Sequence, residues 1–152
     1  MPFVAAVSLD GQGQPMYLKL NLVGGFTALA LGRSAKANLR PGTVVTSDGL
    51  GYFAPVADAG CSHNPMIVVE LKRRHLPRFK WVNMVLNSLK TLAGMFHSLK
   101  FFKYADYYLA DLACRFNRRF DLRALVALLI VDLARCKPFT RAAVRTTSEA
   151  RF

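Results

Sequence analysis

The sequence is poor in cysteine and contains no long apolar run. Its three cysteines, Cys61, Cys114 and Cys136, lie far apart and include no Cys-x-x-Cys pair, which argues against a disulfide framework and against a zinc ribbon or finger. The longest purely apolar segment, 124–131, is less than half the roughly 20 residues that a membrane span requires. No signal peptide follows Met1. These absences predict a cytoplasmic protein with free thiols and no membrane partner.

Acidic residues are also scarce. Lysine and arginine number 21 against nine acids. Residues 1–71 carry four of each, whereas the chain from Lys72 onward carries 17 basic and five acidic residues, which accounts for the whole net charge of +12. Such a basic half-chain predicts a polyanionic partner, nucleic acid first and an anionic membrane surface second. The membrane alternative is weaker because few basic residues lie opposite the apolar helix stripes.

Hydrophobic patterning predicts one α/β domain with a mixed sheet and a helical C-terminal part, over residues 1–136. A basic tail at 137–152 has no periodicity and is expected to be disordered. Asp10 lies in a glycine-rich turn between two strands of a hairpin. In chain order, we expect strands at 3–9 and 16–23, a helix at 26–38, a strand at 43–48, a short helix at 50–58, a strand at 63–69, and helices at 79–97, 102–116 and 121–135.

The helix expected at 79–97 has two different faces. Apolar residues recur at spacings of three and four and predict a buried stripe; they are Trp81, Val85, Leu89, Leu92 and Phe96. Asn83, Asn87 and Lys90 fall on the opposite side, either as a solvated face or as a site. The helix at 121–135, which Asp121 can cap, is apolar nearly all round and is therefore expected to be largely buried.

Two further features carry candidate chemistry. Asp48 ends a strand ahead of a glycine, where α/β proteins place ligands, and its carboxylate suits Mg²⁺ or Mn²⁺; alternatively it caps the next helix. The loop at 72–80 mixes basic and aromatic residues and suits phosphate contact, although a solvated loop is an equal alternative. The histidines His63, His75 and His97 show no metal-ligand spacing.

Several segments together resemble the ISXO-type insertion-sequence transposases over about residues 2–135. They are PFVAAVSLD at 2–10, PGTVVTSDGL at 41–50, VADAGC at 56–61, FKWVN at 79–83, LKT at 89–91, GMFH at 94–97 and RFNRRFDLR at 115–123. The resemblance implies a ribonuclease-H-like mixed sheet with flanking helices. It also implies a bacterial, nucleoid-associated enzyme that cleaves and transfers DNA strands, using two metal ions, Mg²⁺ or Mn²⁺.

Carried over by position, the resemblance makes Asp48 the second catalytic aspartate and Asn83 the third catalytic residue, both as metal ligands. Lys90 matches the basic residue that follows and contacts donor-DNA phosphate. Where the family reads Gly-Asn this chain has Asn87-Ser88, so Asn87 remains an alternative to Asn83. The expected DNA contacts, from the resemblance and the basic loop, are Lys72, Arg73, Arg74, Arg78, Lys80, Lys90, His97, Arg118 and Arg119. The segment 117–119 is alternatively a set of backbone or helix-packing contacts.

The family places a zinc ribbon, and then a strand bearing the first catalytic aspartate, ahead of the segment that matches 2–10. Asp10 is no substitute for that aspartate because it lies in the hairpin turn. We therefore expect an amino-terminally truncated transposase whose chain alone is inactive as an enzyme. The alternative is a non-catalytic DNA-binding protein that acts on transposon ends, as a homo-oligomer or as an inactive subunit of a full-length transposase.

Overall fold

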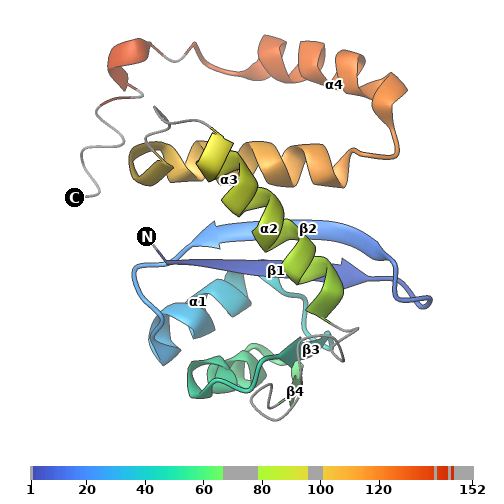
Figure 1. Ribbon diagram of the computed structural model, residues 1–152, viewed down its shortest axis with the longest axis vertical. Helices are drawn as coiled ribbons and strands as arrows, with labels where there is room; N and C mark the ends of the chain where they lie inside the picture. Colours follow the sequence, from blue (N-terminus) through green and yellow to red (C-terminus); the bar gives the residue numbers. More distant parts are fainter. Residues whose placement is uncertain (1, 67–78, 96–100, 139, 144, 146–152) are drawn as a thin grey trace.

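The computed structural model describes residues 2–66, 79–95, 101–138, 140–143 and 145. It is an α/β arrangement of two small sheets and several helices (Figure 1). In chain order the elements are β1 (Phe3–Leu9), β2 (Pro15–Leu22), α1 (Ala28–Asn38), β3 (Val44–Ser47), the 3₁₀ helix η1 (Gly51–Ala59), β4 (Ser62–Pro65), α2 (Lys80–Met95), α3 (Phe101–Asn117) and α4 (Leu122–Arg135). The expected α/β class and element order are confirmed.

The expected single mixed sheet is not seen among the described residues. Strands β1 and β2 pair antiparallel, and β3 and β4 pair parallel, as two separate two-stranded sheets. Each of the four described strands has a partner on one side only, and no described strand joins the two pairs into one sheet.

The β1–β2 hairpin is closed by its turn residues. Asp10 Oδ1 accepts hydrogen bonds from the backbone N–H groups of Gln12 and Gln14, both at 2.8 Å. Gly13 adopts φ 78°, a left-handed conformation that glycine tolerates without steric cost. In β2 the side chains of Leu18 and Leu20 are buried while Tyr17 and Lys19 are exposed, as period-two alternation requires.

The main core lies where α2 and α3 pack on the hairpin. Leu18 and Leu20 of β2, Val85 and Leu89 of α2, and Leu109 of α3 form one buried cluster. Helix α2 crosses the hairpin obliquely (Figure 1). The expected apolar stripe is confirmed at its two central positions in α2, and the exposed face carries Asn83, Asn87 and Lys90, as the sequence predicted.

The ends of that stripe differ from its centre. Trp81 is only half-buried, and Phe96 lies outside the described residues.

A second core joins α1, η1 and the β3–β4 pair. Ala35, Val56 and Cys61 are buried together. Thr27 caps α1 by accepting the N–H of Ala30 at 3.2 Å. Gly32 of α1 lies against Pro55 of η1 so closely that a Cβ would approach the Pro55 Cβ to 3.2 Å. This close approach explains why a helix interior carries a glycine here despite its cost.

The prediction that the last helix is largely buried is wrong. Asp121 caps α4 as expected, accepting from Ala124 N–H at 3.2 Å. However, Ile130 is 61% and Leu133 75% exposed, and both faces of the helix carry exposed apolar residues. An apolar composition calls for burial but supplies no partner, and the described residues do not cover this helix. Asp132 of α4 forms an ion pair with Arg118, at 3.7 Å.

In the segment that follows α4, Thr140 Oγ1 accepts the N–H of Ala143 at 3.2 Å, at the start of a helical turn. The expectation of a disordered tail at 137–152 stays a prediction, since residues 146–152 lie outside the described chain. Among the described helices, none is long and apolar enough to cross a membrane.

Candidate functional site

Asp48 lies directly after β3, at the carboxyl end of the parallel β3–β4 pair. It is half-buried, and its Oδ1 accepts the backbone N–H of Leu50 at 3.3 Å. The capping position of η1 is Leu50, and no side chain caps that helix. Asp48 therefore does not cap η1, and its contact with Leu50 is a local turn contact. The position at the strand end is the one expected for a ligand-binding carboxylate in an α/β protein.

The backbone beside Asp48 is held by a pair that the sequence did not reveal. Ser47 is only 6% exposed, and its Oγ lies 2.9 Å from His63 Nε2. Ser47 Oγ also accepts the N–H of Gly49, at 3.4 Å. The register sets His63 opposite Val45 and Pro65 opposite Ser47, so Ser47, two residues beyond Val45 on the same face of β3, is a diagonal neighbour of His63. A parallel register between short strands cannot be read from their sequence. His63 thus makes a structural contact across the two strands.

Asn83 and Lys90 are both exposed on α2, on the face opposite Val85 and Leu89. The amino-terminal end of α2 is directed toward the part of the molecule that holds β3 and β4 (Figure 1). The described contacts do not join Asp48 to Asn83, and in residues 2–66, 79–95 and 101–138 no three His, Cys, Asp or Glu side chains cluster as a metal site. A metal shared by Asp48 and Asn83 stays a prediction.

The first turn of α2 is attached to the tip of the hairpin. Trp81 Nε1–H donates to the backbone carbonyl of Gly13 at 2.9 Å. The Lys80 ammonium lies 4.9 Å from the centre of the Trp81 ring, within the range of a cation–π contact. Trp81 was expected as part of the apolar stripe and as an aromatic neighbour of the basic loop at 72–80. Its indole N–H therefore has a polar role that helical periodicity alone does not indicate.

The segment 116–119 is engaged with other parts of the protein. Asn117 Oδ1 accepts the N–H of Leu18 at 2.6 Å, and Asn117 Nδ2 donates to the Leu18 carbonyl at 3.0 Å. The Arg119 guanidinium donates to the carbonyls of Pro15 and Phe116. These contacts agree with the packing alternative for this segment.

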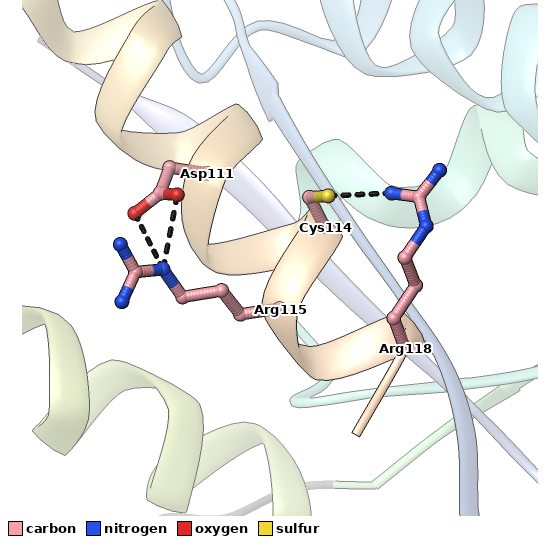
Figure 2. Close-up of polar contacts among 4 residues, drawn as sticks. All are labelled: Asp111, Cys114, Arg115 and Arg118. Carbon is pink, nitrogen blue, oxygen red and sulfur yellow. Dashed lines mark hydrogen bonds and ion pairs between the residues drawn. The ribbon is translucent and has the colours of Figure 1, made fainter. Parts of the chain in front are cut away.

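Arg118 and Arg119 also make aromatic, thiol and ion-pair contacts. The Arg119 guanidinium lies 4.1 Å from the Phe116 ring centre and 4.3 Å from that of Phe120. Arg118 donates to Cys114 Sγ (Figure 2) and pairs with Asp132. Phosphate contact by Arg118 and Arg119 stays a prediction.

The remaining expected DNA contacts divide into two groups. Lys80 and Lys90 are exposed on α2. Five others, Lys72, Arg73, Arg74, Arg78 and His97, lie outside the described residues, as does His75.

One basic residue of α3 is paired with an acid. Arg115 Nε lies 3.0 Å from both Oδ1 and Oδ2 of Asp111, one helical turn earlier (Figure 2). The hydrogen bond to Asp111, and then its negative charge, raise the pKa of Arg115 above its usual value. Arg115 therefore stays charged at any working pH, but a carboxylate beside it offsets its charge toward a polyanion.

Comparison with known proteins gives one match. The family model described as ISXO2-like transposase domain matches residues 1–117. This span contains β1 to α3, Asp48, Asn83 and Lys90, and it ends before α4. No curated protein and no solved structure matches the chain.

Proposed function

Because the chain belongs to the ISXO2-like transposase family, we propose that it acts on DNA as part of the catalytic domain of an insertion-sequence transposase. The observation that carries the proposal is the position of Asp48 at the carboxyl end of the parallel β3–β4 pair. Strand cleavage and transfer by such enzymes require carboxylates at neighbouring strand ends. Asp48 is such a carboxylate, since it directly follows a strand of a parallel pair.

The finer fold we propose is ribonuclease-H-like. In the described residues β1 pairs only with β2, and β3 only with β4. In Figure 1, β1 lies on the side of the hairpin nearer to β3 and β4. An added strand between β1 and β3 would satisfy both open edges and join the ladders into one mixed sheet. A carboxylate on that strand would stand next to Asp48, which ends β3.

Asp48 and Asn83 are ligands of the type that a divalent cation prefers, but they are too few to hold two such ions. Asp48 offers a carboxylate oxygen and Asn83 an amide oxygen, and both are hard ligands of the type that Mg²⁺ and Mn²⁺ prefer. Together they carry one negative charge, which is too little for two divalent ions. When bound, the metal ions would activate the attacking oxygen and stabilise the leaving one. Lys80 and Lys90 would hold the phosphate backbone beside them.

Metal-dependent cleavage of transposon-end DNA tests the proposal. The chain alone should bind such DNA without cutting it, because its described residues group no three possible metal ligands. The same chain fused to a strand that carries an aspartate should cleave in Mg²⁺, and Asp48→Asn in the fusion should abolish cleavage. Cleavage that persists in the Asp48→Asn variant would refute the assignment of Asp48. Cleavage by the unfused chain would refute the need for an added strand.

A non-catalytic role is the second candidate, and the charge distribution favours it. All of the net charge of +12 resides from residue 72 onward, so the chain can hold DNA whether or not it cuts. Binding of this kind is strongly salt-dependent. Such a protein would act on transposon ends as a homo-oligomer or within a complex with full-length transposase. Salt-sensitive binding by both the unfused and fused chains, without cleavage by either, would favour this role.

A further inference from the structure

The hairpin tip and the first turn of α2 are joined by one side-chain hydrogen bond that spans 68 positions of the sequence. Trp81 Nε1–H donates to the Gly13 carbonyl at 2.9 Å. The Gly13 carbonyl is itself held in place, because Asp10 Oδ1 accepts the N–H groups of Gln12 and Gln14 on either side of it. We call this chain of contacts, from Asp10 through Gly13 to Trp81, the tip latch.

The tip latch acts on the part of α2 that carries Asn83. Residues two apart on a helix point about 200° apart, so an indole directed at the hairpin turns Asn83 away from it. Val85 and Leu89, buried against β2, fix the middle of the helix, but the first turn lies beyond them. The indole hydrogen bond is therefore the described polar contact that sets the rotation and position of this first turn.

We propose that Trp81 is a positioning residue, which holds Asn83 in the orientation needed to share a metal ion with Asp48. The hairpin tip at 10–14 thereby belongs to the support of the site, and Asp10 contributes through the backbone of the tip rather than as a metal ligand. This inference rests on the proposed function, since it assumes that Asn83 and Asp48 bind one cation. It adds a residue and a segment to which the sequence assigned no role at the site.

The experiment uses the full chain and Mn²⁺ alone as the probe. The NMR signals of the Asn83 side-chain amide are assigned by their loss in Asn83→Ala, and their broadening is followed as Mn²⁺ is added. Trp81→Phe keeps an aromatic ring, although a smaller one than the indole, and removes the N–H donor. Asp10→Ala loosens the tip from the other end and leaves Trp81, the only tryptophan, as a reporter of the contact through its indole signal. Asn38→Ala, an exposed substitution at the end of α1, is the matched control.

We expect Trp81→Phe and Asp10→Ala each to raise the Mn²⁺ concentration for half-broadening by about threefold to tenfold, the effect of losing one net hydrogen bond. The double variant should be no worse than the single ones, because both act through one contact. Asn38→Ala should change nothing. A purely structural role of Trp81 would lower the melting temperature without changing Mn²⁺ broadening in the protein that remains folded.

The outcomes separate the two levels of the proposal. If Asp48→Asn leaves the broadening of Asn83 unchanged, the shared metal site is wrong and the positioning role falls with it. If Asp48→Asn abolishes the broadening but Trp81→Phe and Asp10→Ala do not affect it, only the tip latch is refuted. Should Trp81→Phe fail to fold, Asp10→Ala decides alone, and an unchanged indole signal in that variant would overturn the coupling between the tip and α2.

Discussion

The side-chain amide of Asn117 pairs with both backbone polar groups of Leu18, a residue 99 positions earlier in the chain. The Asn117 amide thus makes the two hydrogen bonds at the outer edge of β2 that a residue of a neighbouring strand would make. Arg119 extends the contact along the same edge, to the carbonyl of Pro15. An edge strand with its polar groups occupied cannot pair with another chain. The outer edge of β2 is therefore occupied over Pro15–Leu18, while β1 pairs on one side only in the described residues.

Removing the Asn117 amide should destabilise the fold. Leu18 is 2% exposed, so Asn117→Ala leaves a buried N–H and C=O without their partner, at a cost of about 1–3 kcal/mol. Chemical denaturation monitored by circular dichroism measures the change. Asn38→Ala is the control, because Asn38 is exposed and its described side-chain hydrogen bond is to Ser34 O of its own helix. It should change the free energy of unfolding by less than about 0.5 kcal/mol. Equal losses in both variants would contradict the edge pairing.

Two leucines in different helices should lose very different amounts of stability on truncation. Leu109 of α3 is 2% exposed within the main core, whereas Leu133 of α4 is 75% exposed. Leu109→Ala should cost about 2–5 kcal/mol through lost burial and the cavity it leaves. Leu133→Ala should stay within about 0.5 kcal/mol. The comparison by urea titration tests directly whether α4 is exposed in solution, and a large loss at Leu133 would show that α4 is covered there.

Removing the cap of α4 should lower the stability of that helix without affecting α2 and α3. Asp121→Ala removes the acceptor of the Ala124 N–H and should cost about 1 kcal/mol of helix stability. Asp121→Asn retains an acceptor and should restore most of it. Because α4 adds little to either core, we expect faster amide hydrogen exchange in α4 with an unchanged rate in α2 and α3. Faster exchange throughout the protein would mean that α4 is coupled to the main core.

These contrasts show which parts of the structure were predictable from sequence. The turn at Asp10, the stripe at Val85 and Leu89, and the cap at Asp121 depend on neighbours within a few residues, so local patterns predicted them. The pairing of Ser47 with His63 and of Trp81 with Gly13 depends on a register or a helix rotation that forms only on folding. The exposure of α4 could not be predicted, since apolar periodicity indicates what a helix could bury but not whether a partner lies beside it.

The candidate site divides in the same way. Asp48 was placed at a strand end by its position between β-branched residues and glycine, and the structure has it there. Asn83 and Lys90 were placed on the polar face of α2, and they are exposed on it. The juxtaposition of Asp48 and Asn83 is a long-range property that neither pattern determines, and it remains a prediction for the metal experiment.

The last prediction concerns DNA affinity and compares two basic residues of different surroundings. Lys90 is exposed on the polar face of α2, and Arg115 is paired with Asp111. Lys90→Gln should weaken binding to transposon-end DNA several-fold and reduce the slope of log affinity against log salt by about 1, as expected for one lost phosphate contact. Arg115→Gln removes the same formal charge but should have a smaller effect, because Asp111 already offsets it.

Titration of fluorescent DNA at several salt concentrations measures both slopes. Since an arginine side chain stays charged throughout the neutral range, the difference between the variants should not depend on pH there. Equal slopes for Lys90→Gln and the unmodified chain would remove Lys90 from the DNA interface. A larger effect at Arg115 would indicate that DNA binds to α3 and not to α2.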